Sequence, residues 1–237
     1  MLTAYIINLD NDAGRLKQVE EQLLSYRWIT PSRIQALAGS GLSDVATNFL
    51  AKQPSYIKHK GTMGCFISHT KAWESLLQSE GSMALVLEDD ARATDLSPLE
   101  TFSFPAGVDL IFCNQRCSYP FESAELQPFG GVLSLISESN GGIGTDGYLV
   151  SRAGAAKLLK YVERDGFFSH IDLRLAAYSI DLHEAEELKN SQCTTVARLR
   201  KVFPAEHRLV TRVFGKPLIF HASGYGSSRL REDRLRR

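Results

Sequence analysis

Three consecutive carboxylates, Glu88-Asp89-Asp90, follow the short aliphatic run from Ala84 to Leu87. An apolar run of this length predicts a buried strand, and open α/β sheets place ligands at the carboxyl ends of their strands. Neighbouring carboxylates repel one another unless a cation or a set of donors compensates. Because Mg²⁺ and Mn²⁺ prefer oxygen ligands, the cluster predicts a divalent metal site, with a solvated acidic turn as the alternative.

A second apolar run, from Ala4 to Leu9, also ends in polar residues, among them Asn8 and Asp10. A strand, a polar turn and a helix form the opening half of a βαβ unit. If the two apolar runs are parallel neighbours, their polar ends meet at one edge of the sheet. Arg15, in the helix that follows, could then reach a phosphate there, and a salt-bridged surface arginine is the alternative.

A helix is predicted over residues 64–79, because Cys65, His69, Ala72 and Leu76 recur at the spacing of one helical face. His69 therefore lies on or beside the buried face. A histidine there is either a hydrogen-bonded core residue or a ligand. The helix leads directly into the strand that ends in the three carboxylates.

Glycines 142, 144 and 147 match the pattern G-x-G-x-x-G. We reject a dinucleotide site, because the strand-like residues 148–150 follow, whereas that motif opens a helix. Such a loop suits close approach of the backbone to a ligand, or is simply a turn. Asp146 lies in this loop, and Asp172 lies in the first turn of a later helix, where it could also stabilise the helix dipole.

The bulk composition narrows the class of protein. The 237 residues include 27 Lys and Arg and 27 Asp and Glu, so overall charge does not favour nucleic acid. Four cysteines form neither a disulfide framework nor a four-cysteine zinc set, which indicates free thiols and a cytoplasmic protein. No apolar run reaches the roughly 18 residues of a membrane span. We expect one domain over residues 1–228 and a basic tail, Arg229 to Arg237, which either contacts anionic lipid at the inner face of the membrane or is solvated.

The remaining elements are predicted from periodicity and turn residues. Strands are expected within 28–37 and at 109–114, 132–137, 148–150 and 218–221. A helix is expected over 153–163 with Ser151 as its N-cap, and another begins near Asp172. A short helix within loops is expected in 91–107, and irregular chain over 42–62 and 188–216.

Four segments resemble glycosyltransferase family 25, the bacterial lipooligosaccharide sugar transferases related to collagen galactosyltransferases. The segments are Tyr5 to Asp10 with Arg15, Gly64 to His69 with Trp73, Ala84 to Ala91, and Asp146 to Leu159. Together they span most of residues 4–160. The resemblance implies a GT-A-like, Rossmann-type α/β/α sandwich with a mostly parallel central sheet. It also implies a UDP-sugar donor, such as UDP-galactose, and inversion at the anomeric carbon during transfer to a lipooligosaccharide or related glycan.

The resemblance also implies roles for individual residues. Mn²⁺ or Mg²⁺ is assigned to Glu88, Asp90 and His221. The general base that accepts the proton of the acceptor hydroxyl is assigned first to Asp172 and then to Asp146. Binding of the nucleotide-sugar donor is assigned to Asn8, Leu9, Asp10, Arg15, Ser68, His69 and Asp89.

Two other classes of protein remain as alternatives. A metal-dependent nucleotidyl- or phosphoryl-transfer enzyme also uses carboxylates at strand ends, but a further acidic cluster or Lys/Arg motif beside Glu88-Asp89-Asp90 is not seen. A carbohydrate-binding relative without catalytic activity is the second alternative. The three carboxylates together with Asp172 argue against it.

Overall fold

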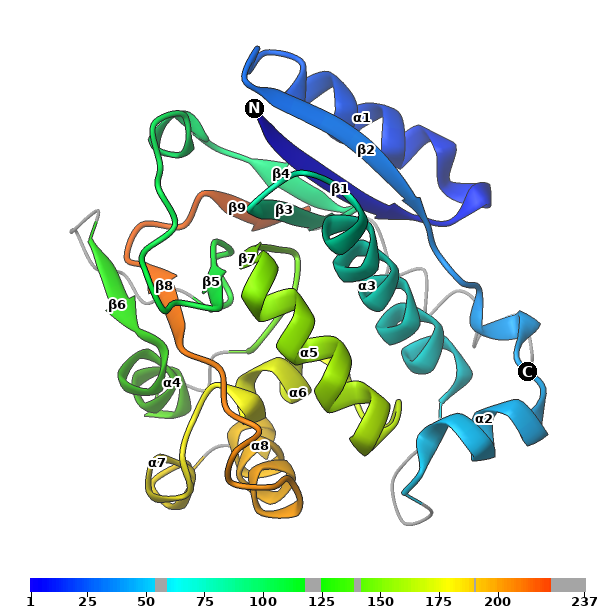
Figure 1. The fold of residues 1–237 in the computed structure, drawn as a ribbon, viewed down its shortest axis with the longest axis vertical. Helices are drawn as coiled ribbons and strands as arrows, with labels where there is room; N and C mark the ends of the chain where they lie inside the picture. The colour runs from blue at the N-terminus through cyan, green and yellow to red at the C-terminus, as the bar shows by residue number, and fades with distance from the viewer. Residues whose placement is uncertain (54–58, 118–124, 139–141, 190, 223–237) are drawn as a thin grey trace.

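The computed structural model describes residues 1–53, 59–117, 125–138, 142–189 and 191–222. Its centre is a seven-stranded sheet in the order β2-β1-β3-β7-β5-β8-β6 (Figure 1). The strands are β1 (Leu2–Asn8), β2 (Ile29–Gln35), β3 (Met83–Glu88), β5 (Leu110–Phe112), β6 (Leu126–Pro128), β7 (Gly147–Ser151) and β8 (Thr211–Phe214). A separate antiparallel pair joins β4 (Ala91–Ala93) to β9 (Ile219–His221).

The strand directions make this a mixed sheet. β1 is parallel to both β2 and β3, and β5 is parallel to β8. β7 runs antiparallel to both of its neighbours, β3 and β5, and β6 is antiparallel to β8. Five of the seven strands therefore share one direction. Because β7 is reversed, its amino end lies beside the carboxyl end of β3, where Leu87 pairs with Gly147.

Helices cover both faces of the sheet, as the predicted α/β/α sandwich requires (Figure 1). In β1, Ala4 and Ile6 pack into one hydrophobic core with Val19 of α1, while Tyr5 packs into the other core with Trp73 of α3. This alternation is the two-residue period of a strand buried on both faces. The helices are α1 (Ala13–Leu23), α2 (Asp44–Ala51), α3 (Lys60–Gln78), α4 (Phe129–Glu138), α5 (Arg152–Asp165), α6 (Ile171–Tyr178), α7 (Leu182–Glu186) and α8 (Ser191–Val202), with short 3-10 turns η1 (Asp10–Asp12), η2 (Gly39–Gly41) and η3 (Ser97–Leu99).

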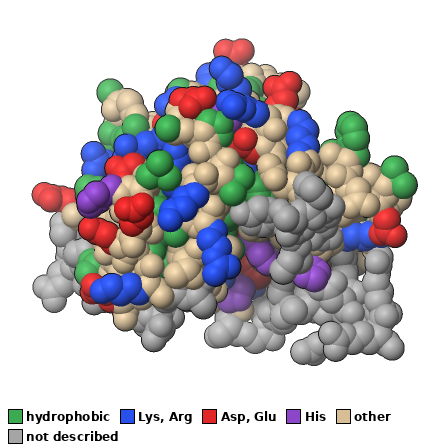
Figure 2. Space-filling view, turned by 90° about the horizontal axis from the view of Figure 1, so that it is seen from below, with side chains coloured by type: hydrophobic (Ala, Val, Ile, Leu, Met, Phe, Trp, Pro, Cys, Tyr) green, Lys and Arg blue, Asp and Glu red, His purple; other side chains and the backbone are tan. Residues whose placement is uncertain are grey.

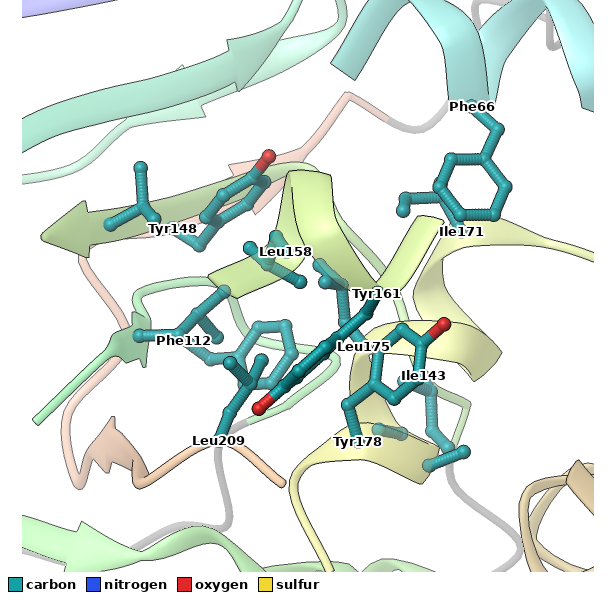
Figure 3. Packing of buried hydrophobic residues seen from close by; sticks show 14 of the residues in the cluster. Phe66, Phe112, Ile143, Tyr148, Leu158, Tyr161, Ile171, Leu175, Tyr178 and Leu209 are labelled. Carbon is teal, nitrogen blue, oxygen red and sulfur yellow. The ribbon is translucent and has the colours of Figure 1, made fainter. Parts of the chain in front are cut away.

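The larger core lies on the face of the sheet that α3 and α5 cover. Figure 3 shows Tyr148 of β7 near Phe112 of β5 and Leu158 of α5. The phenol is fully buried, and its oxygen accepts a hydrogen bond of 2.9 Å from Nε1 of Trp73. A buried hydroxyl needs a hydrogen-bond partner, so this bond helps to set the position of α3 relative to β7.

Several predicted elements are confirmed. The helix predicted over 64–79 is part of α3, and the strand predicted at 84–87 is part of β3. The helix predicted over 153–163 is α5, and Oγ of Ser151 accepts a hydrogen bond of 3.0 Å from N of Gly154 as its N-cap. A long amphipathic pattern with a capping residue carries enough information to be read without tertiary context.

The strand predicted over Val132 to Ser137 is wrong, because these residues belong to helix α4. The buried residues of this stretch are Val132, Leu133, Ile136 and Ser137, two pairs four residues apart, which suits one face of a helix. A short apolar run fits a buried strand or a buried helix equally well. Packing of α4 against the sheet decides between them.

Two stretches predicted as irregular also contain regular elements. Residues 42–62 include α2, whose N-cap Ser43 accepts a hydrogen bond from N of Ala46 at 3.1 Å. Residues 188–216 include α8 and β8. Helix α8 buries Cys193, Val196 and Leu199, which recur every three residues in an otherwise largely polar sequence. The segment 91–107 holds β4 and η3.

No helix in the described part of the chain is both long enough and apolar enough to cross a bilayer. The basic tail, Arg229 to Arg237, and residues 223–228 before it lie outside the described residues.

Candidate metal and donor site

The carboxyl end of β3 lies beside the carboxyl end of β1, because the two strands are parallel and Ile7 pairs with Glu88. Asp89 follows, and its two carboxylate oxygens accept hydrogen bonds of 2.9 Å from Nδ2 of Asn8 and from Nη1 of Arg15. Nη2 of Arg15 also lies 3.6 Å from Oδ2 of Asp90. The polar ends of the two strands therefore meet, and Arg15 connects them from α1.

Asp90, Asp146 and His221 gather one potential ligand atom each, all within 4.8 Å of one another. Nδ1 of His221 is 3.2 Å from Oδ1 of Asp146 and 3.6 Å from Oδ2 of Asp90. Three segments far apart in the chain supply the cluster. On the face drawn in Figure 2, histidine side chains (purple) lie beside acidic ones (red) near the centre of the view.

Backbone pairing explains why these three segments meet. The β4–β9 ladder pairs Ala91 with His221, and N of Ala222 donates to the carbonyl of Asp90 at 3.0 Å. N of Glu88 donates to the carbonyl of Asp146 at 3.2 Å, which continues the β3–β7 ladder by one residue. The positions of all three side chains are thus set by strand registers.

The electrostatics of this cluster favour a cation. Burial, together with the charges of Glu88 and Asp146, raises the pKa of Asp90 to about 6, although His221 and Arg15 act in the opposite direction. The hydrogen bond that His221 donates to Asp146 raises the pKa of His221 against the effect of its own burial. Oδ1 of Asp90 is buried and makes no hydrogen bond to any described residue. Two carboxylates and one imidazole are a donor set that suits Mn²⁺, so the residues present fit a divalent ion.

Arg116 anchors Asp146 from the other side. Nε and Nη2 of Arg116 donate to Oδ2 and Oδ1 of Asp146 at 2.7 and 2.5 Å, a bidentate pair. A Cβ at position 144 would overlap the guanidinium of Arg116, so Gly144 leaves the space that this pair needs. The sequence-based prediction missed Arg116. Its one signal is its position four residues after the strand residue Phe112.

Asp172 lies in the first turn of α6, as predicted, and is partly exposed. Burial lowers the pKa of Arg116, but its hydrogen bonds with Asp146 and the charges of Asp146, Glu88 and Asp172 raise it above its ordinary value. The carboxylate of Asp172 therefore acts on the same guanidinium that holds Asp146. Both predicted general bases, Asp146 and Asp172, therefore interact electrostatically with Arg116.

The side chain of Glu88 has different neighbours from the side chain of Asp90. Its Oε1 accepts a hydrogen bond of 2.7 Å from Oγ1 of Thr145 and lies 3.7 Å from Nε2 of His69. Glu88 thereby joins a second potential ligand cluster, with Cys65 and His69, rather than the one that contains Asp90.

The other predicted donor-binding residues have varied surroundings. Ser68 is fully buried, donates to the carbonyl of Gly64 at 2.6 Å and accepts from N of Leu37 at 2.8 Å. Asp10 is exposed and accepts hydrogen bonds from Arg33 and Gln35. Leu9 is partly buried and directly follows Asn8, the last residue of β1.

Comparison with known families identifies the N-terminal part of the chain. Residues 1–97 match the model described as glycosyltransferase family 25 (LPS biosynthesis protein). The match covers the first 97 of the 237 residues. The matched range contains α1, α3 and the Glu88-Asp89-Asp90 strand end, and the resemblance inferred from the sequence motifs is confirmed.

Curated relatives in family 25 extend the similarity beyond that range. Procollagen galactosyltransferase 1-A of Xenopus laevis is 28% identical over 172 residues, which cover 65% of this chain and 27% of the relative. A glycosyltransferase 25 family member of Aedes aegypti is 28% identical over 173 residues, which cover 66% of this chain and 27% of that protein. The chain thus spans about a quarter of the length of the curated relatives that it matches.

Solved structures of glycosyltransferases give weaker matches. The galactosyltransferase LgtC in complex with donor and acceptor sugar analogs matches with a TM-score of 0.41 at 12% identity, covering 99% of this chain and 95% of that chain. A glycosyltransferase involved in glycosylation of the major capsid of PBCV-1 matches with a TM-score of 0.45 at 10% identity, covering 99% and 97%. At such scores these likenesses carry no argument about the site.

Proposed function

We propose that this chain is an inverting galactosyltransferase that moves a hexose from UDP-galactose onto a lipooligosaccharide or related glycan. The observation that carries the proposal is the convergence of Asp90, Asp146 and His221 at the end of β3, within a chain whose first 97 residues match family 25. The curated galactosyltransferase relatives support the choice of galactose.

We infer that Asp90, Asp146 and His221 hold Mn²⁺, or Mg²⁺ in its place. A divalent ion bound there would neutralise the charge that develops on the departing UDP. Arg116 supports this arrangement, because it holds the carboxylate of Asp146 in one orientation through two hydrogen bonds. We leave Glu88, which the family resemblance assigned to this ion, out of the proposed ligand set, because its Oε1 lies 3.7 Å from Nε2 of His69.

Arg15 and Asn8 serve the site from the end of β1. Both bind Asp89, and Arg15 also approaches Asp90. The Arg15 guanidinium is a positive charge beside the proposed diphosphate position, so it can hold the donor while it orients the acidic turn. Asp10, which accepts hydrogen bonds from Arg33 and Gln35, is the exposed residue at this end of β1.

Asp172 is the general base in this proposal. Inverting transfer needs a carboxylate that accepts the proton of the acceptor hydroxyl as the new glycosidic bond forms. Asp146 is fully buried and paired with Arg116, and it is also a proposed metal ligand. Asp172 is partly exposed and is not one of the proposed metal ligands, which makes it the better candidate.

Initial rates with a panel of UDP-sugars, measured with Mn²⁺ and with EDTA, test the proposal. We expect turnover of UDP-galactose that EDTA abolishes, and a product of β configuration from the α-linked donor. Release of galactose 1-phosphate would point instead to nucleotidyl transfer. Tight binding of UDP-sugar without any turnover would identify a carbohydrate-binding relative.

A cytoplasmic location at the inner face of the membrane is part of the proposal. The five arginines within Arg229 to Arg237 support it, because basic residues near anionic lipid contribute roughly 1 kcal/mol each. Deletion of this tail should lower activity on acceptor in anionic vesicles and leave activity on soluble acceptor unchanged. Equal loss on both acceptors would contradict the membrane contact.

A further inference from the structure

We propose that Cys65, His69 and Glu88 form a second metal site, one that selects a thiophilic ion such as Zn²⁺. It shares no residue with the Asp90, Asp146 and His221 cluster. The inference goes beyond the proposed function, because transfer of the sugar does not require it.

The backbone brings the three side chains together in a simple way. Cys65 and His69 are four residues apart on α3 and therefore project from the same face of the helix. Glu88 is the last residue of β3, on which α3 packs. One ligand atom from each residue lies within 4.8 Å of the other two.

The distances are close to those of a tetrahedral zinc site. Bonds of about 2.0–2.3 Å to zinc place neighbouring ligand atoms roughly 3.5 Å apart. Nε2 of His69 and Oε1 of Glu88 are 3.7 Å apart, so this pair already has the required separation. The sulfur of Cys65, which is partly exposed, lies within 4.8 Å of a ligand atom of each of the other two residues.

An independent observation at His69 points to a ligand. The His69 side chain is completely buried, and its Nε2 makes no hydrogen bond to any residue that the structure describes. A buried polar atom without a hydrogen bond destabilises the fold, because it has lost its contact with water and gained none in return. Because this nitrogen lies 3.7 Å from Oε1 of Glu88, a metal ion between the two would give Nε2 the partner that it lacks.

The opposite edge of the imidazole has the support that metal-binding histidines use. Nδ1 of His69 is 2.9 Å from the hydroxyl oxygen of Tyr148, which also accepts from Trp73. When Nδ1 carries the proton and donates to this oxygen, Nε2 keeps its lone pair for a metal. Thr145 orients the other ligand in the same way, through its hydrogen bond to Glu88. Such outer partners fix ring and carboxylate orientation at metal sites.

The two clusters differ in their donor atoms and therefore in the metal ions that they favour. A thiolate, an imidazole and a carboxylate favour Zn²⁺ or Co²⁺, whereas two carboxylates and an imidazole suit Mn²⁺ or Mg²⁺. A metal bound by Cys65, His69 and Glu88 would connect the middle of α3 to the end of β3. The acidic turn that carries Asp90 begins at that point.

Titration of the full chain with Co²⁺, which stands in for the spectroscopically silent Zn²⁺, tests the site. We expect a thiolate-to-cobalt charge-transfer band that saturates at one equivalent and is lost in Cys65→Ser. The matched control Cys117→Ser removes a buried thiol outside the cluster and should keep the band. Asp90→Asn should also keep it, which separates this site from the proposed catalytic one.

A second measurement works on the unaltered protein. Alkylation of Cys65 by iodoacetamide, followed by mass spectrometry, should slow at least tenfold with Zn²⁺ and remain unchanged with Mn²⁺. Absence of the cobalt band in the wild-type chain, its persistence in Cys65→Ser, or equal alkylation rates with and without Zn²⁺ would each overturn the proposal.

Discussion

Nδ1 of His221 lies 3.2 Å from Oδ1 of Asp146, although the two residues are 75 positions apart in the chain. The contact joins the end of β9 to the loop before β7. Nδ1 also lies 3.6 Å from Oδ2 of Asp90. One imidazole nitrogen therefore faces two carboxylates, an arrangement that either shares a proton or holds a cation.

Replacement of His221 tests its role as a metal ligand. We expect His221→Gln to weaken Mn²⁺ binding about 10- to 100-fold, since loss of even an outer partner costs that much at metal sites. Excess Mn²⁺ should restore most of the activity. Calorimetric titration of Mn²⁺ and rates across a Mn²⁺ series provide the measurement. His183→Gln is the control, because that side chain is 84% exposed on α7. Unchanged Mn²⁺ affinity in His221→Gln would remove His221 from the site.

Arg116 should matter more to metal-free protein than to metal-bound protein. Arg116→Gln leaves the buried carboxylate of Asp146 without its bidentate partner, at a cost of about 2 kcal/mol after allowance for the partial exposure of Arg116. The melting temperature in EDTA should fall by about 4–8 °C. Mn²⁺ should recover part of the loss, because it supplies a replacement positive charge. Arg164→Gln, which removes an exposed pair with Glu206, should change the melting temperature little.

Metal binding should depend on pH through Asp90. Its pKa in the folded chain is raised to about 6, so the folded protein holds this proton more tightly than the unfolded chain does. The resulting stability is present below about pH 4 and is lost as pH rises through 6. The raised pKa of His221 acts in the same direction, since a favourable charge is lost as pH increases.

It follows that Mn²⁺ must displace protons to bind below about pH 6. We expect Mn²⁺ affinity to fall about tenfold for each pH unit and each proton displaced below that point. The gain in melting temperature from Mn²⁺ should grow between pH 5 and 7.5. Melting curves with Mn²⁺ and with EDTA across this range measure it, and a gain that shrinks as pH rises would contradict the assignment.

Asp172→Asn should separate binding from chemistry. General bases contribute roughly 10²- to 10⁴-fold to rate, so kcat should fall by that factor. Binding of UDP with Mn²⁺ should stay within about twofold, because Asp172 is not one of the proposed ligands. Glu186→Gln, at an exposed carboxylate on α7, should leave kcat unchanged. Wild-type kcat in Asp172→Asn would move the proton transfer to another group.

The sequence predicted the strand ends better than it predicted the direction of individual side chains. The resemblance to family 25 assigns Glu88 and Asp90 to one metal ion, and in a continuous strand residues two positions apart lie on the same face. β3 ends at Glu88, however, and Asp89 and Asp90 lie in a turn before β4. Alternation stops with the strand, and the side chains of Glu88 and Asp90 join different clusters.

Other differences have the same origin in tertiary packing. Nothing local distinguishes Arg116 from a surface arginine, because its partner Asp146 is 30 residues away. Arg200 was read as part of a basic irregular stretch, yet it is buried in α8 and donates to the backbone carbonyls of His207, Pro204 and Ala205. Helix α3 needed no such context, since its apolar face is continuous over its length.

The pairing of β4 with β9 has a consequence for how the protein is made. During synthesis, Asp90 emerges from the ribosome well before His221. The short strand β4 therefore has no strand to pair with until β9 has been made. The set of ligands that we propose for the ion is therefore complete only after β9 pairs with β4, at the very end of the described chain.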